Sequence, residues 1–142
     1  MRRFGLIGYP LSHSFSKKYF TEKFEQEEIT ECQYDLFPLK TIDELPFLLR
    51  EYPELEGLNV TIPYKKQVFS FLDETNIPRG LDACNCINIS NGKLVGYNTD
   101  ITGFEKSLRP LLRSYHKKAL VLGNGGAAAA VVFVLQRLGI DF

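Results

Sequence analysis

Four short polar segments of this sequence carry side chains that could do chemistry on a small molecule. The first holds three serines and a histidine, the second ends in a lysine, the third ends in an aspartate, and the fourth is a glycine turn. They occupy residues 8–16, 59–65, 96–100 and 123–127. Hydroxyl donors, an amine and a carboxylate suit the binding of a small polar molecule, and a glycine turn before a helix suits a phosphate group.

The serine segment follows a short apolar run, residues 4–7. Nucleophilic catalysis by serine and histidine would need a third orienting group and a strained elbow, and neither is visible. In an extended loop Ser12, Ser14 and Ser16 point the same way, and the helix expected to begin at Ser16 adds a field that favours an anion. The spacing therefore supports a pocket for a small carboxylate, or a serine that caps the helix while the others are solvated.

Lysine and aspartate stand at the ends of two other segments. Pro63 is well placed to begin a helix over residues 63–72, which puts Lys65 in its first turn, where a positive charge is disfavoured. This favours a functional role for Lys65, although a solvated face shared with Lys66 is the alternative. Asp100 can cap the helix that follows it, or act in a site.

The glycine turn lies between an apolar run, residues 119–122, and an alanine-rich helix that is expected to end before Gly139. Strand, glycine turn and helix bring backbone N–H groups and the positive end of a helix to a pyrophosphate. Ala128 can serve as the third small position, but the residue that would read the ribose lies beyond the sequence. A plain tight turn is the alternative.

Composition narrows the class of protein. Seventeen basic residues balance seventeen acidic ones, and no basic stripe is present, so nucleic acid is not an expected partner. The longest apolar stretch, residues 127–135, is far shorter than the roughly 20 residues of a membrane span, and no signal-peptide core precedes Gly8. A cytoplasmic protein is expected. Its three cysteines are predicted to be free thiols, without a metal site, because no second Cys/His pair has ligand spacing.

Strands and helices alternate along the chain. The patterns predict strands at 3–7, 32–36 and 58–62, a hairpin of 84–89 with 93–97, and a further strand at 119–122. They predict helices from Ser16, from near Asp43, over 63–72, from Asp100, and from the glycine turn to Leu138. This predicts an α/β fold: a three-layer α/β/α domain with a mixed, mainly parallel sheet, followed by the beginning of a Rossmann-type unit.

In this order, the segments resemble the shikimate dehydrogenase family. The resemblance rests on the residues 13–16, 59–65, 83–86, 98–100 with Gly103, and 123–127. Asp82, Cys86, Asn124 and Lys17 depart from the family's usual residues. The resemblance implies a substrate domain followed by an NADP-binding Rossmann domain, with the substrate in the cleft between them.

The family implies roles for particular residues. Ser14 and Ser16 would bind the carboxylate of shikimate, and Thr61, Asn85 and Asp100 would bond its ring hydroxyls or fix Lys65. Lys65 and Asp100 would form the catalytic pair. The residues expected to bind NADP are Gly123, Asn124, Gly125, Gly126 and Ala127.

The implied reaction is the NADP-dependent, reversible reduction of 3-dehydroshikimate to shikimate in aromatic amino acid biosynthesis. A lysine can take the hydroxyl proton if desolvation offsets the nearby carboxylate; otherwise it polarises the oxygen and a shared network moves the proton. Two alternatives stay open: a non-catalytic shikimate-binding module without the cofactor half, and a dehydrogenase acting on quinate as well as shikimate.

Of the predicted domains, the substrate domain is expected to be whole and the NADP-binding domain incomplete. Residues 1–100 form the shikimate-binding domain, 101–116 a connecting helix, and 117–142 an incomplete NADP-binding segment. We therefore expect a fragment or a truncated relative with little or no turnover. We also expect residues 131–138 to expose an apolar helix face, through which two copies could pair as a homodimer.

Overall fold

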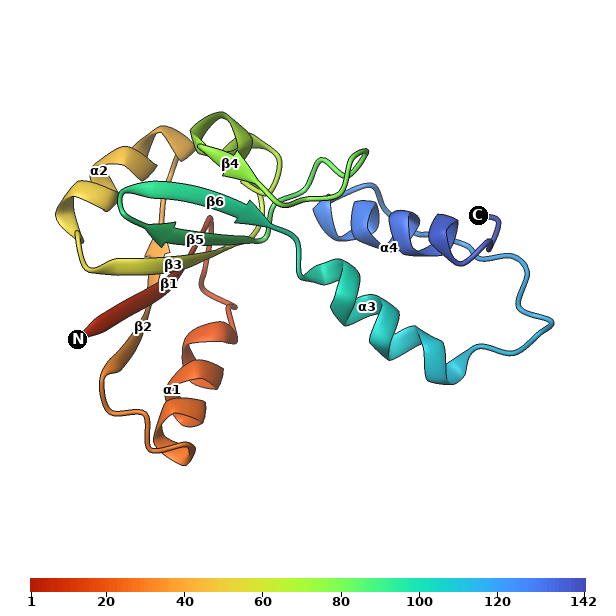
Figure 1. Cartoon of the computed structure of the whole chain (residues 1–142), viewed down its shortest axis with the longest axis horizontal. Coiled ribbons are helices and arrows are strands. Elements are labelled where there is room, and N and C mark those ends of the chain that lie inside the picture. The colour runs from red at the N-terminus through yellow and green to blue at the C-terminus, as the bar shows by residue number, and fades with distance from the viewer.

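The computed structural model describes all 142 residues and contains one six-stranded sheet. The strands are β1 (Arg2–Gly8), β2 (Cys32–Pro38), β3 (Leu55–Val60), β4 (Glu74–Thr75), β5 (Cys86–Ser90) and β6 (Lys93–Tyr97). The helices are α1 (Ser16–Gln26), α2 (Leu45–Glu51), α3 (Asp100–Leu108) and α4 (Gly126–Arg137), with 3-10 helices at Ile42–Glu44, Gln67–Phe71 and Arg109–Leu111. Figure 1 shows the sheet with α1 and α2 at one end of the molecule, and α3 and α4 extending away from it.

The sheet has the order β2-β1-β3-β5-β6-β4 and is mixed. Three of its pairings, β1 with β2, β1 with β3 and β4 with β6, are parallel, and β5 is antiparallel to both β3 and β6. Alternate residues of β1 face opposite layers. Leu6 packs in the cluster beneath α1, whereas Ile7 lies in the larger core beneath α2. The predicted three-layer fold with a mainly parallel sheet is confirmed.

The predicted hairpin is confirmed as β5 and β6. Asn91 and Gly92 connect the strands, with φ values of 51° and 75°. Positive φ at both central residues is what a two-residue turn of this kind requires, and asparagine followed by glycine tolerates it at low cost.

The prediction of a helix over residues 63–72 is wrong. Turns cover the first part, and only Gln67–Phe71 is helical, as a 3-10 helix. The carbonyl of Lys65 accepts a hydrogen bond from Cys84 N at 2.7 Å, so it is not the acceptor for the residue four positions later. Lys65 therefore lies in a turn beside the sheet, not in the first turn of a helix.

Three predicted helix caps are also wrong. Ser16 and Asp100 are the first residues of α1 and α3, and neither side chain caps its helix. At α3 the carbonyl oxygen of the Asn98 side chain accepts from Ile101 N at 3.1 Å. Asp43 lies inside the 3-10 helix that precedes α2. Asp100 is thereby left free to bond elsewhere.

The second part of the molecule is held together by a separate cluster. Ala130 and Val134 of α4 are buried against Ile101 of α3 and against Leu81 and Ala83 of the loop before β5. The predicted helix after the glycine turn is confirmed, and Gly139 follows it with φ 67°. α3 and α4 therefore pack as one unit on the loop that leads into the sheet.

The strand predicted at 119–122 does not form. The only β-bridge beside this segment is an isolated parallel one between Lys118 and Asp141. A strand does not form because no neighbouring strand is present for the segment to pair with. Leu120 and Leu122 are consequently 84% and 86% exposed. Leu120 and Leu122 are thus the most exposed large apolar residues of this unit, and both lie before the glycine turn.

The apolar face expected on residues 131–138 is not exposed. Val134 and Leu135 are buried, and the other apolar residues of that range are at least partly covered. α3 and the loop before β5 cover them. Pairing of two copies through α4 stays an untested prediction.

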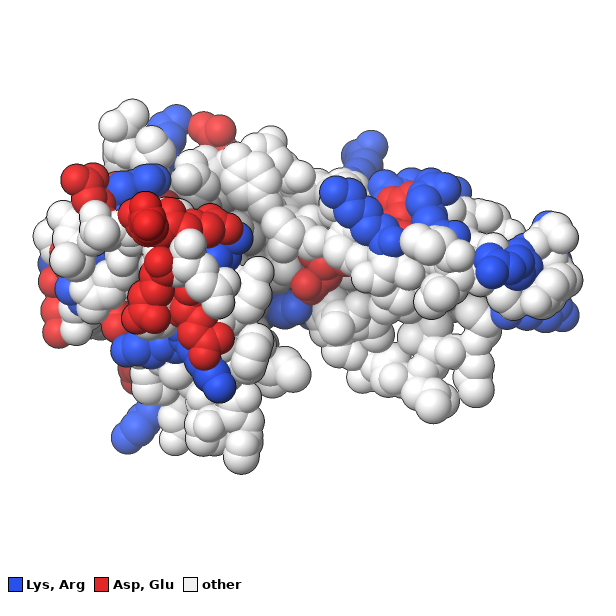
Figure 2. Space-filling model, turned by 90° about the horizontal axis from the view of Figure 1, so that it is seen from below, with Lys and Arg blue, Asp and Glu red and all other residues white.

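Charge is unevenly distributed between the two parts. Residues 101–142 contain six Lys and Arg but only two Asp and Glu, although the whole chain is balanced. Figure 2 shows acidic side chains gathered over the part that contains α1 and the sheet, and basic ones over the α3 and α4 unit. None of the helices has the length and apolar character that crossing a membrane requires.

Candidate active site

The predicted polar segments converge because the strands that carry them end at one edge of the sheet. β1, β3 and β6 run in the same direction, and each is followed by one of these segments. Asn85 precedes the antiparallel β5 and so reaches the same edge. The carboxyl ends of parallel strands are where α/β proteins form their binding crevices.

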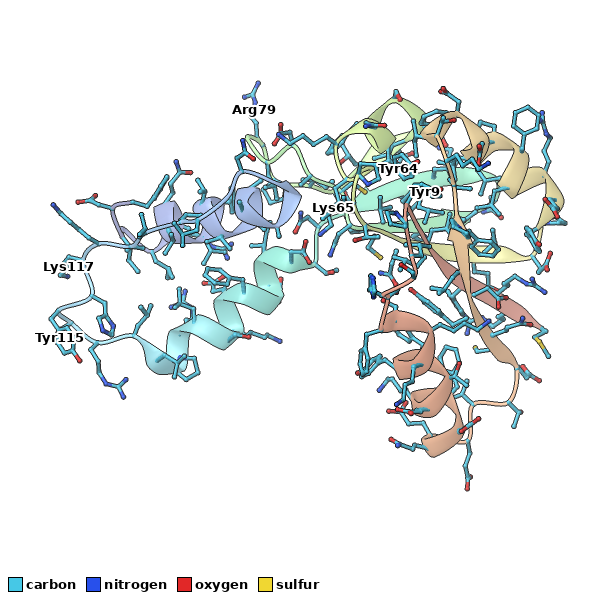
Figure 3. The ribbon with its side chains drawn as sticks, turned by 180° about the vertical axis from the view of Figure 1, so that it is seen from behind. Tyr9, Tyr64, Lys65, Arg79, Tyr115 and Lys117 are labelled. Carbon is cyan, nitrogen blue, oxygen red and sulfur yellow. The ribbon has the colours of Figure 1, made fainter.

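Lys65 and Asp100 form an ion pair at this edge. Lys65 Nζ donates to Asp100 Oδ2 at 2.6 Å, although the residues are thirty-five positions apart. The lysine side chain is 16% exposed and the aspartate 32%, so the pair is partly shielded and still reachable from solvent. Figure 3 places Lys65, together with Tyr9 and Tyr64, at the junction between the sheet and the helical unit.

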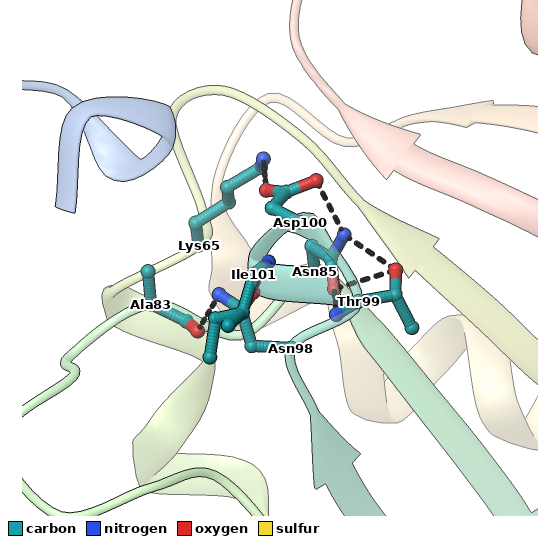
Figure 4. A network of polar contacts seen from close by, with 7 residues as sticks. All are labelled: Lys65, Ala83, Asn85, Asn98, Thr99, Asp100 and Ile101. Atoms are coloured by element: carbon teal, nitrogen blue, oxygen red, sulfur yellow. Dashed lines mark hydrogen bonds and ion pairs between the residues drawn. The ribbon is translucent and has the colours of Figure 1, made fainter. Parts of the chain in front are cut away.

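Asn85 fixes the other oxygen of Asp100. Its Nδ2 donates to Asp100 Oδ1 at 2.8 Å and to Thr99 Oγ1 at 2.9 Å, while its Oδ1 accepts from Thr99 N at 2.8 Å. Asn85 is buried, and both of its amide hydrogens are used within this network (Figure 4). A side chain so occupied is better placed to orient Asp100 than to donate to a ligand.

Asn98 and Thr99 belong to this network but were not predicted as site residues. Asn98 Nδ2 donates to the carbonyl of Ala83 at 2.6 Å, and the same side chain accepts from Ile101 N. It thus ties the segment before β5 to the beginning of α3. The signal in the sequence was the polar run at residues 98–100, whose partners only the fold reveals.

The serine segment lines a separate cavity of about 470 Å³ beside the end of β3. Ser14, Ser16 and Thr61 line it together, with His13 and Tyr9. Lys65, Asn85 and Asp100 do not line this cavity. Thr61 lies just after β3 and four positions before Lys65. In the sequence it therefore stands between the serine segment and Lys65.

Local bonds order the serines. Ser14 N donates to the carbonyl of Leu11, and Ser14 Oγ accepts from Ser16 N at 3.3 Å. No hydrogen bond joins His13 to any of the serines, and His13 is exposed. This agrees with the rejection of a Ser/His nucleophile, and it leaves the Ser14 hydroxyl available as a donor.

Tyr34 supports the serine segment from the sheet and was missed by the sequence analysis. Its hydroxyl donates to Asn59 Oδ1 at 2.7 Å, and its ring stacks on Phe20 of α1 with centroids 4.4 Å apart. Burial raises the pKa of Tyr34, and a hydrogen bond with the Ser16 side chain opposes that rise in pKa. Tyr34 thus connects β2, β3 and the first residue of α1.

We expect Tyr34→Phe to lower the free energy of unfolding by about 1 kcal/mol, because Asn59 Oδ1 loses its donor in a partly buried location. Urea unfolding followed by circular dichroism measures the change. Tyr19→Phe is the matched control, since the Tyr19 hydroxyl is exposed and makes no hydrogen bond to another residue. Equal effects of the two substitutions would contradict the role given to Tyr34.

The predicted glycine turn is present at the beginning of α4. Gly123 has φ 112°, a conformation that favours glycine, and Gly125 is extended with φ −74° and ψ −178°. α4 begins at Gly126, so the turn exposes the helix N-terminus that an anionic group would approach. Asn124 lies between Gly123 and Gly125, and Ala127 follows Gly126 as the second residue of α4.

The three cysteines are free thiols. Burial raises the pKa of both Cys84 and Cys86. No group of three or more histidine, cysteine or acidic side chains is arranged to hold a metal ion.

The profile of the "Shikimate dehydrogenase substrate binding domain" matches residues 6–87, which is more than half of the chain. The chain belongs to the shikimate dehydrogenase family. The matched range contains the serine segment, Thr61, Lys65 and Asn85, and it ends before Asp100.

Individual members of the shikimate dehydrogenase family are similar in sequence to nearly the whole chain. The chain is 40% identical over 143 residues to a shikimate dehydrogenase (NADP(+)) of Carboxydothermus hydrogenoformans, covering 96% of this chain and 50% of the relative. A similar relative from Syntrophomonas wolfei is 40% identical, at 96% and 48% coverage. The chain therefore spans about half the length of the curated relatives that it matches.

Solved structures of the family are also similar in fold. Shikimate dehydrogenase 1 from Peptoclostridium difficile superposes with a TM-score of 0.86 at 33% identity, covering 99% of this chain and 54% of the other. The shikimate 5-dehydrogenase of Thermus thermophilus, solved in complex with shikimate, gives 0.85 at 32% identity, with 99% and 54% coverage.

Proposed function

We propose that this chain is the shikimate-binding part, with the beginning of the NADP-binding part, of an NADP-dependent shikimate dehydrogenase. The reaction is the reversible reduction of 3-dehydroshikimate to shikimate. The observation that carries the proposal is the Lys65–Asp100 pair at 2.6 Å, set at the same edge of the sheet as the end of β1, from which the serine segment leads. An amine and a carboxylate so placed suit proton transfer to and from a secondary alcohol.

Each group has a distinct task in the proposed reaction. Ser14 and Ser16 hold the substrate carboxylate, and Thr61 bonds a ring hydroxyl nearby. Lys65 takes the hydroxyl proton on oxidation when its amine is neutral, and as the ammonium it returns the proton on reduction, with Asp100 holding the nitrogen in place. Asn85 orients Asp100 by bonding its other oxygen.

NADP, when bound, supplies or accepts the hydride. The residues proposed to hold its pyrophosphate are those of the glycine turn, because their backbone leads into the N-terminus of α4. The proposed domains are residues 1–100 for the substrate, 101–116 as the connection, and 117–142 for the first part of the cofactor unit. Within the connection, α3 ends at Leu108.

Titration calorimetry tests the proposal against a non-catalytic binding module. Shikimate should bind the chain, and binding of shikimate without NADP would favour the module. Absence of shikimate binding would contradict both. A fusion that continues residue 142 with the remaining half of the Carboxydothermus relative should reduce NADP with shikimate, and quinate offered to the same fusion tests the breadth of substrate.

We expect Ser14→Ala to weaken shikimate binding about tenfold, equivalent to about 1.4 kcal/mol, because a hydroxyl donor to the carboxylate is lost. Turnover at saturating shikimate should change little, since this bond is made equally in the ground and transition states. Calorimetry on the chain and rates of the fusion measure the two quantities. Ser12→Ala is the matched control, because Ser12 does not line the cavity.

A further inference from the structure

Lys65 is held at both ends of its side chain. Its backbone carbonyl accepts from Cys84 N at 2.7 Å, which fixes the turn to the segment before β5. Its ammonium bonds Asp100 at 2.6 Å. Between these two points the methylene chain passes the first residue of α4, Gly126.

The contact at Gly126 leaves no room for a side chain. A methyl group built on Gly126 would stand 2.9 Å from Lys65 Cδ and 3.1 Å from Lys65 Cβ. The Cβ atom cannot move away by rotation of the side chain, because its position is set by the backbone. The other glycines of the turn differ: a methyl group on Gly123 or Gly125 would meet nothing within 4 Å.

α4 cannot retreat to relieve such a contact. Ala130 and Val134, one and two turns after Gly126, are 1% and 0% exposed in the cluster with Ile101, Leu81 and Ala83. Overpacking of a core of this kind is unfavourable, so the lysine would have to yield. Because Lys65 is anchored at its backbone, its displacement would appear at the amine.

We propose that Gly126 is a positioning residue for Lys65: its bare backbone seats α4 on the methylene chain of the lysine and thereby keeps the ammonium on Asp100. This role differs from that of a glycine whose lack of a side chain lets a phosphate group approach the backbone. The glycine turn expected to hold the cofactor is therefore in direct contact with the lysine of the substrate part. The inference rests on the proposed function only in treating Lys65 as the catalytic amine.

The reactivity of Lys65 toward an amine reagent tests the contact without substrate or cofactor. The 142-residue chain is labelled for short times, and modification of Lys65 is compared with that of Lys66 in the same sample by mass spectrometry. Gly126→Ala should raise the ratio of Lys65 to Lys66 labelling about fivefold, as the ion pair with Asp100 is lost. An unchanged ratio in a folded Gly126→Ala chain would overturn the inference.

Gly125→Ala is the matched control, since it adds the same methyl group one residue earlier in open space. An equal rise in this variant would overturn the inference, because it would trace the effect to the turn in general. In the fusion enzyme, Gly126→Ala should lower kcat and leave the KM for shikimate unchanged, as even a small misplacement of a reacting group slows turnover. If the unmodified chain does not bind shikimate while Gly126→Ala still raises the labelling ratio, the proposed function fails and the positioning contact stands.

Discussion

Replacing Lys65 with alanine should reduce turnover of shikimate by NADP at least about 100-fold, the loss that removal of a positioned proton-transfer group produces. The amine that meets Asp100 disappears, and no other lysine bonds that carboxylate. The measurement is the rate of NADP reduction by the fusion enzyme at saturating shikimate. Binding of shikimate should weaken much less than turnover, because the carboxylate pocket is untouched.

Lys66→Ala is the matched control for this prediction. Lys66 is the next residue, its side chain is 54% exposed, and it pairs with Asp82 at the surface at 2.9 Å. Surface pairs of this kind contribute little, so turnover should stay within about twofold of the parent. Normal turnover of Lys65→Ala, or an equal loss in both variants, would refute the role proposed for Lys65.

Replacing Asn85 with leucine should lower the free energy of unfolding by about 2–4 kcal/mol. Leucine has a similar volume but no polar atoms, so Thr99 N and Asp100 Oδ1 both lose their partners. A buried polar group without a partner is far more costly than a lost surface contact. Urea unfolding monitored by circular dichroism measures the change.

The control for Asn85 lies on the next strand. Asn88 is exposed and makes no side-chain hydrogen bond to another residue, so Asn88→Leu should change stability by no more than about 0.5 kcal/mol. A loss at Asn85 no larger than that at Asn88 would mean that the network of Asn85 does not stabilise the fold. Because Asp100 is one of the released partners, Asn85→Leu should also slow the fusion enzyme.

Local patterns predicted the sheet well because its determinants are local. An apolar run predicted β1, alternation predicted β2, and Asn91 with Gly92 predicted the hairpin. The strand predicted at 58–62 is present as β3, which begins three residues earlier and ends at Val60. The helix over 63–72 failed for a reason that the local sequence does not contain: the carbonyl of Lys65 is taken by Cys84, nineteen positions later. The strand at 119–122 failed because a strand needs a neighbour, which the pattern of its own residues cannot supply.

The candidate site was predictable only in part. Residue types and spacing nominated Lys65 and Asp100 separately, and the family resemblance, not the spacing, paired them. The disfavoured setting expected for Lys65, in the first turn of a helix, does not occur: Lys65 lies in a turn, and only its methylene chain contacts the first residue of α4. Tyr34 and Asn98 were missed because each acts through a partner from another strand or loop.

Asp100 is the first residue of α3, three positions after β6 ends at Tyr97. In Figure 3, Tyr115 and Lys117 lie at the opposite end of that unit, while Lys65 stands beside its base. Leu81 and Ala83 hold α4 against the segment before β5, so the base of the unit is fixed beside the ammonium–carboxylate pair, whereas Tyr115 in the distant loop is 75% exposed. Motion confined to the distant loop would therefore leave the separation of the reacting groups unchanged.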